Sequence, residues 1–300
     1  MTQAPGLQRR PGDGHEAAGC RRERLVDNQA LRTVYEYMTR VDFSRNATVY
    51  DRRHGALLGR DDAERLCGAA GLPLAASVLD IGAGTGRVAV PLAERGCAVV
   101  AVEPARGMVD ELRAKASSDR LAVVIGEGGQ LPFRSGTFDA VVIARVLYLA
   151  SDWRHILREA RCVITTDGLL LHEWGNGQPD EPWVQIREQA RRLFETAGVH
   201  QPFHPGVRSE TEVSQELGTL GFVHVSDVLM GPGPQLTLRE FLRRLVDGEL
   251  SYTWDVPKEV QADCLPRLAT WCEQGFDLDR PVAIPNQISW TIYRAAHSQP

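Results

Sequence analysis

Glycines occupy positions 82, 84 and 86 of the stretch SVLDIGAGTGRVAV (residues 77–90), and Asp80 precedes them. The stretch starts as an apolar strand-like run and ends as an apolar run at helical spacing. Glycine supplies no side chain for packing and loses more backbone entropy on folding than other residues. Three glycines between a strand and a helix therefore indicate that a ligand comes close to this backbone.

Two known nucleotide-binding patterns match this loop only in part. The dinucleotide fingerprint G-x-G-x-x-G has its third glycine one position later than Gly86, and a phosphate loop needs a lysine that is missing here. Nicotinamide oxidoreduction is therefore disfavoured. A tight turn with no ligand remains an alternative for the glycines alone.

A second acid strengthens the case for a ligand. The run CAVVAVEP places Glu103 at the end of the next predicted strand, residues 97–103. In open α/β sheets, an acidic side chain at this place accepts hydrogen bonds from ribose hydroxyls, and ligands bind at the carboxyl ends of the strands. The glycines and Glu103 together predict a ligand that contains a nucleoside.

The elements that must position these residues alternate between strands and helices. Near-continuous Val, Ile and Leu strands interleaved with helices are typical of a parallel sheet covered on both faces. The predicted strands are 77–82, 97–103, 122–127, 138–144 and 168–174, and the predicted helices between them are 87–96, 105–116 and 152–164.

The flanking regions have a different character. Residues 1–24 lack periodicity and are expected to be disordered, and residues 25–75 are expected to be helical, including 31–41 and 61–72. The later chain is mostly helical, with two further predicted strands. These helices are 181–198, 209–221, 237–246 and 257–275, and the strands are 224–230 and 287–295. We expect the late helices to be insertions around one sheet, without a second domain.

Taken together, VLDIGAGTGR, VVAVEPARGMVDELR and the run from IGEGGQLPF through FDAVVIARVLYLA resemble the class I S-adenosylmethionine-dependent methyltransferases, and most closely their small-molecule branch. The similarity covers about residues 77–174, and YDRRHGALL (50–58) also resembles that branch. The resemblance implies a Rossmann-like, mostly parallel seven-stranded sheet with helices on both faces and an added helical lid. Residues 76–300 would form the cofactor-binding domain, with helical insertions at about 179–222 and 232–285, and residues 25–75 would form a lid segment.

The resemblance also assigns residues to the cofactor S-adenosylmethionine. Asp80 and the loop of Gly82, Gly84 and Gly86 would lie against the methionyl part, where a carboxylate attracts the ammonium group. Glu103 would bind the ribose hydroxyls. Glu127 stands where the family usually has an aspartate that binds the adenine amino group, and the Gly128 N–H would meet a ring nitrogen. Tyr50 would help to close over the methionyl end.

Candidates for the methyl-acceptor pocket lie at and beyond the ends of the fourth and fifth predicted strands and in the inserted helices. Arg145 is predicted to contact substrate or cofactor, and His172 is the candidate general base, with Arg145 assigned to catalysis beside it. Strand alternation places His172 and Trp174 on one face of the sheet. Tyr148, Trp174, Tyr252 and Trp254 are the candidate acceptor-binding residues. Each has a structural alternative, because a lone histidine or tryptophan is more often a packing residue.

Composition and charge exclude several classes of function. The formal net charge of -5 disfavours nucleic-acid binding. The six scattered cysteines lack C-x-x-C spacing, and His200 and His204 flank a proline, so no metal site is predicted. The amino-terminal residues lack the apolar centre of a signal peptide, and the chain has no membrane-length apolar run, so a cytoplasmic protein is expected.

These observations predict an enzyme that methylates an O, N or C atom of a small molecule, with no membrane partner. The alternative is a protein of the same fold that binds the cofactor without methyl transfer, as an assembly partner or to steer a cyclisation. The acceptor and the oligomeric state do not follow from the sequence.

Overall fold

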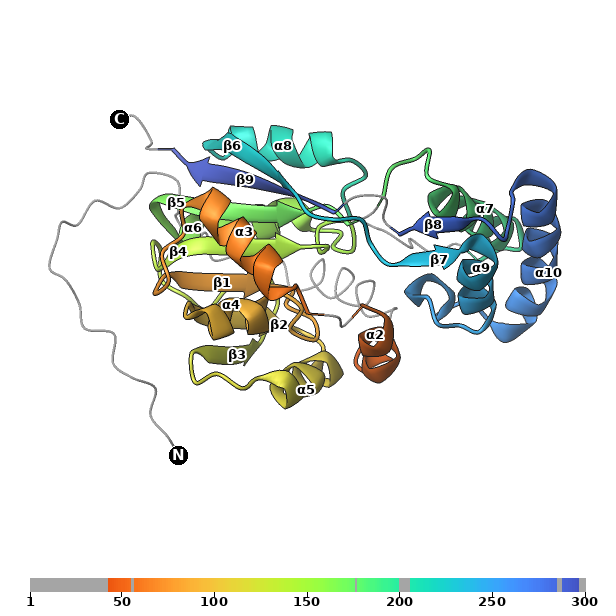
Figure 1. The fold of residues 1–300 in the computed structure, drawn as a ribbon, viewed down its shortest axis with the longest axis horizontal. Helices are drawn as coiled ribbons and strands as arrows, with labels where there is room; N and C mark the ends of the chain where they lie inside the picture. The colour runs from red at the N-terminus through yellow and green to blue at the C-terminus, as the bar shows by residue number, and fades with distance from the viewer. Residues whose placement is uncertain (1–42, 55–56, 176, 200–205, 285–287, 297–300) are drawn as a thin grey trace, which may run out of the picture.

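The structure is a computed structural model that describes residues 43–54, 57–175, 177–199, 206–284 and 288–296. A seven-stranded sheet forms its centre, in the order β3-β2-β1-β4-β5-β9-β6 (Figure 1). The five strands β1 to β5 are parallel to one another, and β9 pairs antiparallel with both β5 and β6. The strands are β1 (Ser77–Ile81), β2 (Ala98–Glu103), β3 (Leu121–Ile125), β4 (Phe138–Ala144), β5 (Ile164–Glu173), β6 (Phe222–Leu229) and β9 (Ser289–Ala295).

Helices cover both faces of this sheet because successive strand residues point to opposite sides. In β1, Val78 belongs to an apolar cluster with α3 (Arg60–Ala70) and α4 (Ala89–Arg95). Its neighbour Leu79 belongs to the cluster on the other face, with α6 (Trp153–Val163) and α8 (Glu210–Thr219). The predicted α/β fold with a mostly parallel seven-stranded sheet is confirmed.

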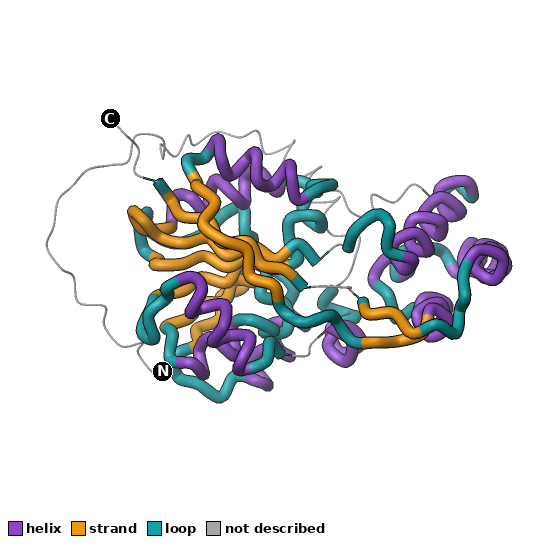
Figure 2. Tube along the Cα trace, turned by 45° about the horizontal axis from the view of Figure 1, so that its top comes forward, coloured by secondary structure: helices purple, strands orange, loops and turns teal. Residues whose placement is uncertain are grey.

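Three of the later helices and a short 3-10 helix form a separate lobe with its own apolar core. The lobe comprises α7 (Pro182–Thr196), α9 (Leu238–Val246), the short 3-10 helix η1 (Ser251–Thr253) and α10 (Lys258–Gly275). Trp183, Phe241 and Leu268 are among its buried core residues. Two of the chain segments between the lobe and the sheet, the one after β6 and the one before β9, are hydrogen-bonded to each other, from the Met230 N–H to the Ile288 carbonyl at 2.8 Å. Figure 2 shows the chain leaving the central sheet through a loop and entering the short strands beside the helices of the lobe.

Most element boundaries agree with the predicted ones, with instructive exceptions. A two-stranded sheet of β7 (Gln235–Thr237) and β8 (Pro281–Ala283) was not predicted, because three residues are too few to show strand alternation. β5 starts at Ile164, earlier than predicted, because Ile164 pairs with Phe138 across a register shift. The predicted helix 61–72 is α3, and Gly71 caps it with a left-handed φ of 64°.

Two further helices lie beside the glycine loop. α5 (Arg106–Lys115) follows β2, and α2 (Ala47–His54) contacts α5 from the amino-terminal side. The Thr48 hydroxyl donates to Glu111 at 2.8 Å. The predicted tail 1–24, the predicted helix 31–41 and the histidines His200 and His204 lie outside the described residues.

Candidate active site

The glycine loop follows β1, and its three glycines meet different surroundings. Gly82, Gly84 and Gly86 have φ values of 69°, 55° and 91°, a region that favours glycine. A Cβ atom on Gly82 would lie 2.5 Å from the Val146 side chain, and one on Gly86 would lie 3.0 Å from Leu112. A Cβ atom on Gly84 would meet nothing within 4 Å. Gly82 and Gly86 therefore allow neighbouring side chains to pack closely against the loop, whereas Gly84 borders open space that a ligand can enter.

Glu103, at the end of β2, is tied directly to this loop. Its Oε2 accepts a hydrogen bond from the Gly84 N–H at 2.9 Å, and its Oε1 accepts one from the Ala105 N–H at 3.0 Å. Burial raises the pKa of Glu103, and the two backbone N–H groups act against that rise. Because each carboxylate oxygen can accept more than one hydrogen bond, the group still has acceptor capacity for two hydroxyls.

Asp80 is a buried acid within β1 whose side chain is incompletely satisfied. The residue is 2% exposed, and its Oδ2 atom has no hydrogen-bond partner within the described residues. Burial, and then the charge of Glu103, raises the pKa of Asp80 to about 7. A buried carboxylate is costly without a positive partner. Asp80 is therefore suited to hold the ammonium group of a ligand.

The segment after β3 holds the two residues predicted to bind adenine. Glu127 is half-buried, and burial raises its pKa. Its charge also contributes to the raised pKa of Glu103, which places the two acids in the same neighbourhood. A Cβ atom on Gly128 would lie 2.7 Å from the Ile81 side chain. Gly128 therefore allows this segment to lie close against the end of β1.

One cavity brings together several of the predicted cofactor residues. Its lining comprises Tyr50, Asp80, Gly82, Ala83, Gly84, Thr85, Arg87, Val88, Ala144 and Arg145. Gly86, Glu103, Glu127 and Gly128 are not among these residues, although Glu103 is bonded to Gly84 of the lining. Arg87 was not singled out from the sequence. Its position directly after the third glycine, in the first residues beyond the loop, was the available signal.

Helix α2 places Tyr50 over this cavity. The Lys115 ammonium group of α5 donates both to Asp51 of α2 and to the Thr85 carbonyl of the glycine loop, the latter at 3.2 Å. The Tyr50 ring packs edge-on against Phe43 at 5.9 Å between centroids. Burial raises the pKa of Tyr50. Lys115 therefore ties α2 to the glycine loop, and the Phe43 ring supports Tyr50 where it borders the cavity.

His172 lies in a different environment from these residues. It is 1% exposed in β5, between Ile143 and Thr291 of the neighbouring strands, and it is not among the residues that line the cavity. Burial lowers its pKa to about 4. A general base works best with a pKa near the working pH, so the imidazole would accept a proton weakly. The geometry thus offers no support for the catalytic role predicted for His172.

Three of the four predicted acceptor-binding aromatics make edge-on ring contacts. Tyr148 packs edge-on against Trp174 at 5.9 Å, and the Trp174 indole N–H donates to the Gly177 carbonyl at 3.3 Å. Trp254, beside η1, packs against Phe43 at 5.7 Å. Burial, and then the neighbouring Tyr50 phenol, raises the pKa of Tyr148. Tyr148 therefore adjoins the residue that covers the cavity.

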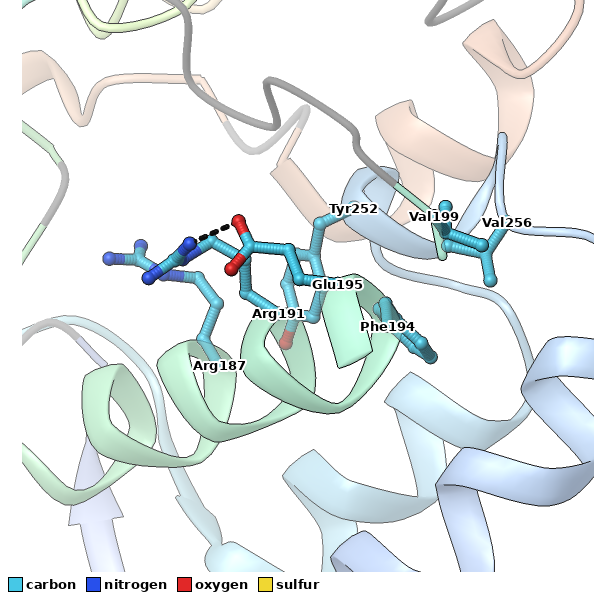
Figure 3. Close-up of a pocket in the computed structure, with 7 residues that line it drawn as sticks. All are labelled: Arg187, Arg191, Phe194, Glu195, Val199, Tyr252 and Val256. Atoms are coloured by element: carbon cyan, nitrogen blue, oxygen red, sulfur yellow. Dashed lines mark hydrogen bonds and ion pairs between the residues drawn. The ribbon is translucent and has the colours of Figure 1, made fainter. Parts of the chain in front are cut away.

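Tyr252 lines a second cavity, within the lobe. Its other lining residues are Arg187, Arg191, Phe194, Glu195, Val199 and Val256 (Figure 3). Figure 3 shows Arg191 paired with Glu195 along α7. The Arg187 guanidinium lies 5.3 Å from the Trp183 ring centre, and burial lowers its pKa. The four predicted acceptor residues are thus divided between two neighbouring regions.

Known proteins resemble this chain both in sequence and in fold. Residues 79–172 match the family described as methyltransferase domain. The YcgJ protein from Bacillus subtilis has a similar structure, with a TM-score of 0.57 and 17% identity over 80% of this chain and all of that one. The fold is that of the class I S-adenosylmethionine-dependent methyltransferases. The [4+2]-cyclase SpnF shares this fold, with a TM-score of 0.51 and 13% identity over 79% of this chain and 80% of that one.

Sequence relatives match about a third of this chain. An uncharacterized methyltransferase of Mycobacterium tuberculosis is 36% identical over 38% of this chain and 46% of its own length. The demethylmenaquinone methyltransferase of Corynebacterium glutamicum is 39% identical over 31% of this chain and 39% of its own. The malonyl-[acyl-carrier protein] O-methyltransferase of Geobacter sulfurreducens is 37% identical over 32% and 37%. The chain therefore spans less than half the length of these relatives.

The match to the methyltransferase domain and the shared fold imply S-adenosylmethionine as the cofactor.

Three further observations concern the described residues alone. None of the helices in the described ranges is long and apolar enough to cross a membrane. No group of His, Cys, Asp and Glu in these ranges could hold a metal ion. Cys67, Cys97, Cys264 and Cys272 are free, buried thiols.

Proposed function

We propose that this protein transfers the methyl group of S-adenosylmethionine to an O, N or C atom of a small-molecule acceptor. The observation that carries the proposal is the cavity beside Gly84, where a bare backbone, a buried acid with an unpartnered oxygen and the Glu103 carboxylate meet. These groups suit the amino-acid and ribose parts of the cofactor. A demethylmenaquinone methyltransferase among the relatives supports a small-molecule acceptor.

The chain's own residues would act mainly by positioning. When bound, the cofactor supplies an already activated methyl group, so alignment and exclusion of water provide a large share of the rate. Glu103 would bind the ribose hydroxyls. Gly84 and Asp80 would lie against the methionyl part, with Asp80 on its ammonium group. α2 would cover the cavity with Tyr50. Tyr148 and Trp174, next to that cover, would contact the acceptor.

Calorimetry with S-adenosylmethionine tests the cofactor assignment. We expect one S-adenosylmethionine site per chain and tighter binding than for NAD. Glu103→Ala should weaken the cofactor by about tenfold or more, because a carboxylate that binds two hydroxyls makes charge-assisted hydrogen bonds. Unchanged affinity in that variant would remove Glu103 from the site. Tight NAD binding without S-adenosylmethionine binding would overturn the proposal.

Methyl transfer itself needs a second experiment. The protein would be incubated with methyl-labelled cofactor and a small-molecule extract of its source organism. We expect labelled small molecules and an equal amount of S-adenosylhomocysteine. Cofactor binding without either product would favour the alternative, a protein of this fold that does not transfer methyl.

A further inference from the structure

Arg145, directly after β4, has an unusual backbone. Its φ is 61°, in the left-handed region that a residue with a side chain seldom adopts. The Arg145 N–H donates to the Glu173 carbonyl at 2.9 Å, which holds the chain in this conformation. Such strain persists where the surrounding structure imposes it, commonly at functional sites. The backbone at Arg145 is therefore held in a conformation that fixes where its side chain starts.

The Arg145 side chain follows a path that Gly175 leaves open. A Cβ atom on Gly175 would lie 2.3 Å from Arg145 Cγ and 2.8 Å from Cδ, distances that side chains do not reach. Gly175 also has a positive φ of 72°. The chain after β5 is therefore shaped so that the aliphatic part of Arg145 can lie across it.

Glu173 binds this arginine together with a second one. Its Oε1 accepts from Arg145 Nε at 2.6 Å, and Arg87 donates through Nη1 to Oε2 at 2.7 Å and through Nη2 to Oε1 at 3.1 Å. The Glu173 side chain is 2% exposed, and those of Arg87 and Arg145 are 16% and 20% exposed. Two largely buried cations therefore share one carboxylate, which leaves an excess positive charge.

The hydrogen-bonding capacity of Arg145 is only partly used. Within the described residues its guanidinium donates through Nε alone, so the donors on Nη1 and Nη2 have no hydrogen-bond partner there. Arg145, Arg87 and Asp80 all line the same cavity. That cavity thus presents an arginine pair with excess positive charge and an acid with an unpartnered oxygen, which is complementary to an amino-acid zwitterion.

We propose that Glu173 is a positioning residue that holds Arg87 and Arg145 as a paired cation for the carboxylate of the cofactor's methionyl part, while Asp80 takes its ammonium group. This inference rests on the proposed function. Glu173 does not itself line the cavity and acts through the two arginines. Planar guanidinium groups match a carboxylate in geometry as well as charge.

Decarboxylated S-adenosylmethionine, which lacks only the carboxylate, isolates this interaction. Calorimetry on the full chain would compare its dissociation constant with that of S-adenosylmethionine. We expect the unmodified protein to prefer S-adenosylmethionine by at least about tenfold. Glu173→Gln and Arg145→Met should bring that ratio to within about twofold. The Arg145 guanidinium loses the carboxylate that positions it in the first variant, and it is absent from the second.

Asp80→Asn is the matched control in the same cavity. Both compounds carry the ammonium group, so this variant should weaken both and keep their ratio. A merely structural role for Glu173 predicts that Glu173→Gln weakens both compounds equally, and that result would overturn the proposal. So would an unmodified protein that binds both equally, whatever the folding of the variants. If neither compound binds the unmodified protein, the proposed function itself fails.

Discussion

Gly84 is the residue at which a small substitution best separates ligand binding from stability. Gly84→Ala would place a methyl group in open space at a φ of 55°, where backbone strain costs about 1 kcal/mol. The methyl group would occupy the side from which the cofactor approaches. We expect a loss of affinity of about tenfold or more by calorimetry, alongside that modest loss of stability.

Gly136→Ala is the control for this substitution. Gly136 has a φ of 63° and also meets nothing within 4 Å, but it lies in the turn before β4. Both variants should lose similar free energies of unfolding, and only Gly84→Ala should lose cofactor affinity. Equal affinities for the two variants would show that the ligand does not contact Gly84.

Asp80 predicts a pH dependence of cofactor binding. Its pKa of about 7 lies above the value of an exposed aspartate, so the empty folded protein binds a proton that the unfolded chain releases. Its contribution to stability without ligand therefore falls as pH rises from about 4 to 7. An ammonium group binds the ionised carboxylate, so cofactor affinity should rise with pH from 6 to 8. Calorimetry at several pH values should show a smaller change of affinity with pH in Asp80→Asn than in the unmodified protein. An equal change in both proteins would mean that a group other than Asp80 causes the pH dependence.

At the scale of elements, α2 is the part that covers the site. Tyr50→Phe keeps the ring against Phe43 and removes one hydroxyl, which contributes about 0.5–1.5 kcal/mol when bonded. We expect weaker cofactor binding with little change in thermal stability. Tyr50→Ala should weaken binding further and leave residues 43–54 open to protease even with cofactor present.

Thr48→Val provides the comparison on the same helix. It removes the exposed hydrogen bond to Glu111 without touching the cavity, so affinity should stay unchanged. Wild-type affinity in both Tyr50 variants, with lower stability only in Tyr50→Ala, would mean that Tyr50 is a packing residue alone.

At the scale of the whole molecule, Phe43 links the cover of the site to the helical lobe. Its ring packs against Tyr50 at 5.9 Å and against Trp254 at 5.7 Å, so it joins α2 to the segment at η1. We expect S-adenosylhomocysteine to slow amide hydrogen exchange in residues 47–54 and also in residues 249–256. Phe43→Ala should abolish the second effect, because the contact between the two parts is lost.

Phe276→Ala serves as the control for that experiment. Phe276 packs against Trp271 at 5.4 Å inside the lobe, away from α2. The variant should raise exchange in the lobe generally and keep the ligand-dependent slowing at residues 249–256. Ligand-dependent slowing that survives in Phe43→Ala would show that the lobe senses the ligand by another route.

Much of the sheet could be predicted because its signals are local. The strands around Asp80 and Glu103 are apolar runs bounded by glycine. The three glycines of the loop indicate positive φ values, which residues with a Cβ atom seldom adopt. The three-residue strands β7 and β8 could not be predicted, because they exist only through pairing with each other. Helix α9 is strongly amphipathic, but its apolar face does not specify which partner it covers.

The sequence by itself determined the α/β class, the parallel strands and the glycine loop after β1, since these depend on residue type and short-range periodicity. Only the tertiary structure decided that Arg87, Arg145 and Glu173 share one buried ion-pair network. It also decided that His172 is sealed inside the sheet and that α2 reaches the lobe through Phe43. These relations join residues far apart in the chain, and the free energy of burying and pairing them depends on distance in space.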